Sequence, residues 1–169
     1  MKQQTIQLLE YNVWANRTIF KHLKELPEGV DRQEVQSVFA TFADALFHLY
    51  LVDNIWLSAM SGATFDETMA RINRVNEEAK GKSVQEMEGL FEGIADKYLS
   101  FFHSLPDVDA VKEYPHPQYG ILRASYAELA QHIVNHGTYH RGNVTAMLRQ
   151  MGHAGVATDY PFFLYTLNR

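Results

Sequence analysis

The segment Ser83–Pro106 reads SVQEMEGLFEGIADKYLSFFHSLP and carries the clearest secondary-structure signal in the chain. Ser83 and Glu86 form an S-x-x-E capping box, which is typical of a helix start, and Pro106 ends the pattern. Apolar residues between these limits alternate at spacings of three and four: Val84, Met87, Phe91, Ile94, Tyr98, Phe101 and Leu105. This spacing predicts one helix whose apolar stripe packs into the seam of a helical bundle.

Helical periodicity also extends over three other long segments. The first two are predicted at about Gln3–Leu26 and Ser37–Met60. The last begins at a second capping box, formed by Ser125 and Glu128, and ends before Gly152. Four amphipathic helices in one chain favour the all-α class and a four-helix bundle.

The connecting segments are less regular. A short helix is predicted around Asp66–Asn76, and the proline-rich residues 106–124 indicate either an irregular loop or a small hairpin. Because about ten residues join the first two long helices, we expect these helices to be antiparallel neighbours. The aromatic tail Asp159–Leu167 is expected to pack back on the bundle. We therefore predict a single four-helix bundle domain over residues 1–169.

Composition excludes several classes of function. The chain has 15 Lys and Arg against 20 Asp and Glu, a formal charge of −5, which argues against nucleic acid as a partner. It lacks the run of about 18 apolar residues that a transmembrane helix needs, so no membrane partner is expected. The start of the chain lacks the apolar core of a signal peptide, which predicts a cytoplasmic protein. The absence of cysteine excludes disulfides, thiolate ligands and cysteine nucleophiles.

Three of the eight histidines interrupt apolar stripes where a bundle core is expected. His48 lies in the stripe of the second long helix, and His136 and His140 lie one turn apart in the stripe of the last. Burying an unpaired imidazole costs about 1–3 kcal/mol, so these side chains need partners. A shared divalent cation would satisfy all three and leave one coordination position open, as in catalytic zinc sites. Zinc, nickel, iron or copper would each suit imidazole.

Other polar residues keep two interpretations each. His132 belongs either to the surroundings of the metal or to the plain surface, and His116 is either a fourth ligand or a loop residue. Asp44 either orients the imidazole one turn later or is solvated. Asn16 and Asn143 are candidates near the cavity with either a structural or a catalytic role, and the structural role is favoured. No residue receives a catalytic or cofactor-binding role from the sequence, and phosphate-binding and nucleophile-elbow motifs are missing.

Four motifs resemble the DinB/YfiT-like superfamily and together cover essentially the whole chain. They are Y-N-x-W-A-N at Tyr11–Asn16, H-x4-D-x2-W-L at His48–Leu57 and N-H-G-T-Y-H-R-G-N-V at Asn135–Val144. The closing T-D-Y-P-x2-L-Y at Thr158–Tyr165 matches the usual tail of that superfamily. The H-x3-H-R-G block is the most specific of these motifs.

The resemblance implies a four-helix bundle of mirror-type up-and-down topology that often forms a homodimer. It also implies a divalent metal held by one histidine of the second helix and two of the last, which are His48, His136 and His140 in this chain. Characterised relatives include transferases and isomerases that use low-molecular-weight thiols. The family name records damage-inducible expression and does not imply DNA binding.

Three functional hypotheses follow. The first is a metal-dependent enzyme, a thiol-dependent S-transferase or a hydrolase, in which the cation activates a low-molecular-weight thiol or water toward a small-molecule substrate. The second is a non-catalytic metal- or ligand-binding bundle of the stress response, with its metal site closed by a fourth ligand. In the third, the histidines only form hydrogen bonds.

Overall fold

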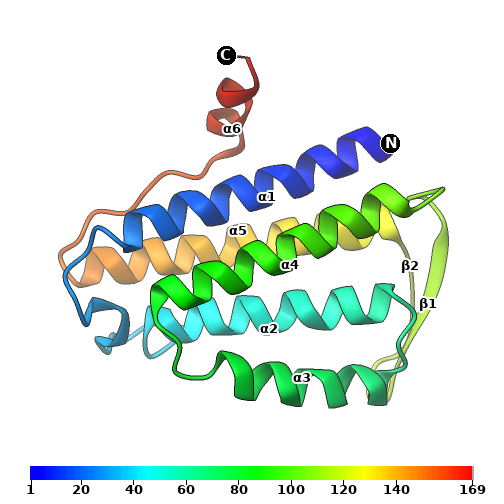
Figure 1. Cartoon of the computed structure of the whole chain (residues 1–169), viewed down its shortest axis with the longest axis horizontal. Coiled ribbons are helices and arrows are strands. Elements are labelled where there is room, and N and C mark those ends of the chain that lie inside the picture. The colour runs from blue at the N-terminus through cyan, green and yellow to red at the C-terminus, as the bar shows by residue number, and fades with distance from the viewer. Residues whose placement is uncertain (169) are drawn as a thin grey trace.

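The computed structural model describes residues 1–168, so only the last residue of the predicted domain lies outside the description. Its main body consists of α1 (Lys2–Leu23), α2 (Phe42–Met60), α4 (Val84–Ser104) and α5 (Tyr126–Gln150), which run side by side (Figure 1). α1 packs against α4 and α5, and α2 packs against α3 (Phe65–Ala79) and α5 and less extensively against α4. The predicted all-α four-helix bundle is confirmed. Among the described residues, no helix combines the length and apolarity needed to cross a bilayer.

The expectation that the first two long helices are neighbours is wrong. α1 packs against α4 and α5 instead of α2, so α1 and α2 occupy diagonal positions in the bundle. The physical reason is the length of their connection, because α1 already ends at Leu23 and α2 begins only at Phe42. This segment includes a short 3-10 helix, η1 (Val30–Arg32), and it is long enough to cross the end of the bundle.

The start of α2 lies five residues later than the predicted Ser37, because Thr41 caps the helix. The Thr41 hydroxyl accepts a hydrogen bond from the backbone amide of Asp44, and the Asp44 carboxylate accepts one from the backbone amide of Thr41 at 3.1 Å. This reciprocal pair satisfies two donors that the first turn of a helix leaves free. Residues 37–41 are consequently extended or bent rather than helical.

Two smaller elements flank the bundle. α3 (Phe65–Ala79) lies along α2 (Figure 1), which confirms and lengthens the predicted short helix. An antiparallel hairpin of β1 (Val111–His116) and β2 (Gly120–Ser125) precedes α5. The hairpin decides between the two interpretations of the proline-rich segment, and Gly120 permits its turn through a φ of 80°.

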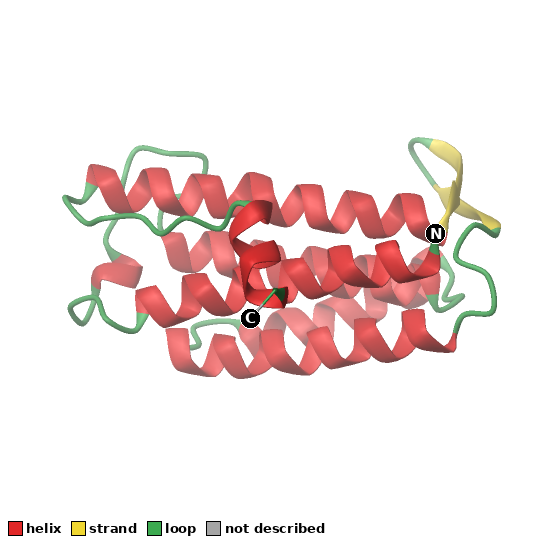
Figure 2. Ribbon diagram, turned by 90° about the horizontal axis from the view of Figure 1, so that it is seen from above, coloured by secondary structure: helices red, strands yellow, loops and turns green. Residues whose placement is uncertain are grey.

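The aromatic tail packs back on the bundle as predicted. It forms α6 (Tyr160–Leu167), which crosses the bundle when the molecule is seen from above (Figure 2). Phe163 is buried, and its ring lies 5.9 Å from that of Tyr11 and 6.0 Å from that of Trp14. The Tyr11 hydroxyl donates a hydrogen bond to the backbone oxygen of Thr158 at 2.9 Å. α1 therefore anchors the end of the described chain.

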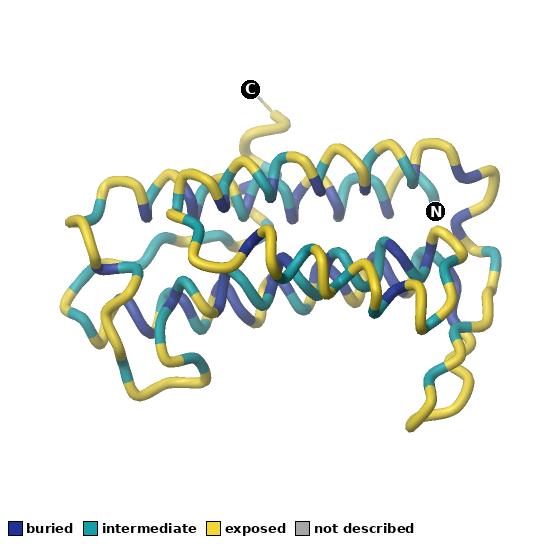
Figure 3. Tube along the Cα trace, turned by 60° about the horizontal axis from the view of Figure 1, so that its bottom comes forward, coloured by how far each residue is buried: buried dark blue, intermediate teal, exposed yellow. Residues whose placement is uncertain are grey.

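The buried positions face inward along all of the long helices, as the dark blue segments in Figure 3 show. In α4 the predicted stripe is buried at Met87, Phe91, Ile94 and Tyr98. Its last turn differs, because Phe102 is fully buried there. Each such side chain contributes about 1.5–3 kcal/mol of hydrophobic free energy, so polar groups inside this core must find partners.

Candidate metal centre

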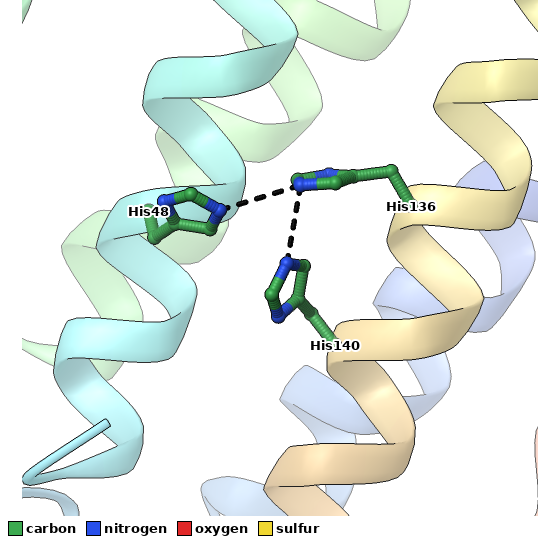
Figure 4. A group of neighbouring side chains, drawn as sticks. All are labelled: His48, His136 and His140. Atoms are coloured by element: carbon green, nitrogen blue, oxygen red, sulfur yellow. Dashed lines mark hydrogen bonds between the residues drawn. The ribbon is translucent and has the colours of Figure 1, made fainter. Parts of the chain in front are cut away.

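Three histidine side chains converge between α2 and α5 (Figure 4). Nε2 of His136 lies 3.3 Å from Nε2 of His48 and 3.1 Å from Nε2 of His140. His48 comes from α2, whereas His136 and His140 point from successive turns of α5 toward it. His140 is buried and the other two are half-buried. The structure thus brings together the three residues that the sequence singled out, and the cluster could hold a metal ion.

The distances from Nε2 of His136 to the other two rings fit tetrahedral coordination. With metal–nitrogen bonds of about 2.0–2.1 Å, the edge of such a tetrahedron is about 3.3–3.4 Å long. The observed Nε2–Nε2 distances of 3.1 and 3.3 Å are close to that edge. Hydrogen bonding alone fits less well, because Nε2 of His136 offers either one proton or one lone pair and faces two other ring nitrogens. A shared cation would satisfy all three rings.

The protonation of the cluster also suits metal binding. Burial, and after it the neighbouring rings of His140, His48 and His132, together lower the pKa of His136 to about 4. Burial lowers the pKa of His48. The pKa of His140 is lowered mainly by burial and to a smaller extent by the nearby ring of His48. The neutral form of each ring is therefore favoured near pH 7, and a neutral ring keeps a lone pair for a metal.

The outer nitrogens of these rings have unequal surroundings. The side-chain nitrogen of Asn143 lies 3.3 Å from Nδ1 of His140. Nδ1 of His136 is buried and has no hydrogen-bond partner within residues 1–168. The sequence made Asn143 a candidate near the cavity with a structural role favoured, and the structure places its side chain beside a candidate ligand. The signal in the sequence is its spacing of three from His140, which places both residues on one helix face.

Aromatic rings surround part of the cluster. The ring of Phe39, in the segment before α2, lies 5.3 Å from the rings of both His48 and His140. Tyr139 contacts His140 at 4.9 Å with its ring edge-on, and 61% of Tyr139 is exposed. One side of the cluster is therefore shielded by an apolar ring, and another opens toward solvent beside a tyrosine.

The two further histidines lie outside the cluster. His132 is exposed and contacts the ring of Trp56 at 5.0 Å, while its ring lies 5.8 Å from that of His136. His116 sits in β1 and contacts the ring of Tyr119 at 4.7 Å. The interpretation of His116 as a fourth ligand is wrong, because the hairpin carries it away from the cluster.

Asp44 is occupied at the start of its helix. Its carboxylate accepts hydrogen bonds from the hydroxyl of Thr41 at 2.7 Å and from the backbone amide of the same residue. Within the described chain, no hydrogen bond joins Asp44 to His48. The interpretation of Asp44 as the group that orients this imidazole is therefore wrong, since the capping box uses the carboxylate.

A second face of α5 carries a buried arginine that ties this helix to α1. Arg141 donates hydrogen bonds to Oδ1 of Asn12 at 2.7 Å and to Oδ1 of Asn16 at 2.8 Å. A third bond joins it to the hydroxyl of Thr138 at 3.1 Å. A Cβ atom at Gly137 would lie 2.5 Å from Oδ1 of Asn12, so glycine permits this close approach. The expected structural role of Asn16 is supported.

Asp53, the acidic residue of the H-x4-D motif, is buried near this arginine. It lines a cavity of about 20 Å³ together with Asn12 and Asn16, which is room for about one water molecule. Burial raises the pKa of Asp53 to about 7, and the charge of Arg141 opposes that rise. The phenol of Tyr98 donates a hydrogen bond to the backbone oxygen of Asp53 at 2.6 Å.

The fold and the cluster define a class of helical bundles with a three-histidine site between two neighbouring helices of the core, α2 and α5. The profile of the DinB family matches residues 1–168, and the chain belongs to this family. It is 42% identical over 165 residues to Protein DinB of Bacillus subtilis (strain 168), covering 98% of this chain and 96% of that protein.

A solved structure with the same fold is the DinB-like protein from Bacillus cereus ATCC 10987. The two structures superpose with a TM-score of 0.64, and the alignment covers 89% of this chain and 94% of that one. The sequences are 16% identical, so this likeness shows the fold alone. The resemblance noted from the four sequence motifs is confirmed.

Proposed function

We propose that this protein is a metal-dependent enzyme whose divalent cation is held by His48, His136 and His140. The observation that carries the proposal is the convergence of three imidazoles between two core helices, with Nε2–Nε2 distances of 3.1 and 3.3 Å. A divalent ion bound there would keep its full positive charge and lower the pKa of a thiol or water that it binds. Such a nucleophile would attack a small-molecule substrate.

The side chains of the protein supply position and shielding. The two ligands on α5 lie toward α2, while Arg141 on a different face of α5 holds this helix against α1. Phe39 covers the rings of His48 and His140 and limits access of water on that side. Because the chain contains no cysteine, a thiol would have to come from a low-molecular-weight cofactor.

The number of ligands favours catalysis over simple binding. In residues 1–168, the cluster contains three histidines and no additional carboxylate or histidine. A closed structural site usually has four protein ligands, whereas three leave a position for a substrate or nucleophile. This count supports the enzyme over the non-catalytic metal- or ligand-binding stress-response bundle, which requires a fourth ligand.

The experiment is an assay of purified protein loaded separately with zinc, nickel and iron. One arm follows conjugation of an electrophile to low-molecular-weight thiols, and the other follows hydrolysis of an activated ester without thiol. We expect a rate above that of His136→Ala in at least one arm. Stoichiometric metal with no rate above this variant in either arm would contradict the enzyme and favour the non-catalytic alternative.

A further inference from the structure

We propose that Asn143 is a positioning residue whose side-chain amide sets the tautomer of His140. The inference rests on the proposed metal site, because only Nε2 of His140 faces the other two rings. Asn143 follows His140 by one helical turn, is half-buried, and places its side-chain nitrogen 3.3 Å from Nδ1 of that ring. The amide of Asn143 therefore contacts the nitrogen that decides where the imidazole carries its proton.

A neutral imidazole has one proton for two nitrogens. If the amide oxygen of Asn143 faces His140, it accepts a hydrogen bond from Nδ1–H, and Nε2 keeps a lone pair for a metal. If the amide nitrogen faces His140, it donates to Nδ1, and the proton of the ring must sit on Nε2. The orientation of one amide thus separates a ring that can bind metal from a ring that cannot.

The structure matches the second of these orientations of the amide. The amide nitrogen of Asn143 faces Nδ1 of His140, and Nε2 of His140 lies 3.1 Å from Nε2 of His136. With the proton on Nε2, His140 donates to His136, and both contacts are satisfied. Binding of a cation at Nε2 then requires the proton to move to Nδ1 and the amide to rotate by about 180°.

The other two candidate ligands lack this kind of support. Nδ1 of His136 is buried without a partner in the described part of the chain, and no hydrogen bond to Nδ1 of His48 is found there either. A protein acceptor on the outer nitrogen orients a ligating ring and increases its basicity. Asn143 does not touch the ion, but it is the residue that supports the outer nitrogen of a candidate ligand. We therefore expect its replacement to weaken metal binding strongly.

The test compares three variants of the full chain. Asn143→Leu removes both the donor and the acceptor at similar volume, and Asn143→Asp offers an acceptor only. Asn135→Leu makes the same change at an exposed position of the same helix and serves as the control. Zinc affinity is measured by competition with a chromophoric chelator, and melting curves in excess chelator check that each variant is folded.

We expect zinc affinity to fall about 10- to 100-fold in Asn143→Leu and to be maintained or increased in Asn143→Asp. Asn135→Leu should bind zinc like the wild type. In ¹⁵N NMR spectra, His140 of the metal-free wild type should carry its proton on Nε2, and zinc should move it to Nδ1. In Asn143→Asp the proton should sit on Nδ1 with or without zinc.

The proposal is overturned if Asn143→Leu binds zinc as tightly as the wild type and leaves the tautomer of His140 unchanged. Failure of the metal site itself gives a different result, in which the wild type binds no zinc. The metal-free spectra then still decide the role of Asn143. An altered His140 tautomer in Asn143→Leu supports that role, and an unaltered tautomer contradicts it.

Discussion

His136 is the central residue of the cluster, because its Nε2 lies within 3.3 Å of both other rings. Its pKa is lowered to about 4 mainly by burial, so the ring is neutral over most of the physiological pH range. The spacing of His136 and His140 could be predicted, since four residues make about one helical turn. Their proximity to His48 could not follow from periodicity, because it depends on which helices of the bundle are neighbours.

Replacing this central ligand should remove the metal without unfolding the protein. We expect His136→Ala to lose stoichiometric zinc and with it the stabilisation that zinc gives the wild type, about 2.7 kcal/mol at a zinc concentration 100 times the Kd. Elemental analysis and urea unfolding with and without zinc measure both effects. Equal stabilisation of the variant and the wild type by zinc would contradict a role for His136 as a ligand.

Asp53 should make stability depend on pH in an unusual direction for a carboxylate. Burial raises the pKa of Asp53 to about 7, whereas an ordinary aspartate titrates near 4 in the unfolded chain. The folded state therefore holds a proton that the unfolded state has lost, and the contribution of Asp53 to stability falls as pH rises from about 4 to about 7. Above pH 7 the carboxylate is ionised in both states and the loss is complete.

The variant Asp53→Asn isolates this effect from the histidines, whose lowered pKa values act in the opposite direction. In urea unfolding with chelator, we expect the stability of Asp53→Asn relative to the wild type to increase from pH 4 to pH 7 and then level off. The largest possible slope is about 1.4 kcal/mol per pH unit. A difference that stays constant over this range would show that Asp53 titrates normally.

At the scale of the element, α5 has two functional faces. Its metal-facing side carries His136 and His140, and its other side carries Arg141, which binds two asparagines of α1. Gly137 lies where α5 approaches α1, and an added Cβ would lie 2.7 Å from a guanidinium nitrogen of Arg141. Both faces come from one short stretch of sequence, N-H-G-T-Y-H-R-G-N-V, and each helical turn contributes to both.

Two glycines of α5 provide a matched test of this packing. Gly137→Ala should destabilise the protein by about 1–3 kcal/mol, because the methyl group displaces the arginine or its partner. Gly142→Ala should instead stabilise it by up to about 1 kcal/mol, because no atom lies within 4 Å of the added Cβ and alanine favours helix. Thermal melts of the metal-free variants measure both, and equal shifts would contradict the account.

The elements themselves were largely predictable, and their ends less so. Capping boxes at Ser83 and Ser125 mark the starts of α4 and α5 in the sequence and in the structure. The start of α2 was misplaced because apolar periodicity continues upstream of Thr41, although Thr41 and Asp44 form a readable T-x-x-D box. Periodicity also fails to show that Arg141 is buried, since its partners come from a helix more than a hundred residues away.

At the scale of the whole molecule, the candidate site joins helices that are far apart in the sequence. His48 and its two partners lie on α2 and α5, while α3 and the hairpin stay outside the cluster. α2 lies beside α5 because α1 and α2 occupy diagonal positions in the bundle. The sequence suggested a short connection between α1 and α2, and a short connection does not predict this placement. The long segment from Leu23 to Phe42 makes this placement possible.

A cation bound between two helices should stabilise both of them against local opening. We expect zinc to slow amide hydrogen exchange in the middle of α2 and α5 and to leave α3 and the hairpin unchanged. Mass-spectrometric exchange with and without zinc, repeated on His48→Ala, measures this. Protection spread evenly over the chain, or protection that persists in the variant, would argue against a site between these helices.

The central claim is that the three histidines hold one divalent cation through their Nε2 atoms. Anomalous diffraction at a metal absorption edge, from crystals of the zinc-loaded protein, tests it most directly. We predict one anomalous peak between α2 and α5, within about 2.0–2.1 Å of Nε2 of His48, His136 and His140. A well-ordered cluster without an anomalous peak, or a metal bound elsewhere on the protein, would contradict the claim.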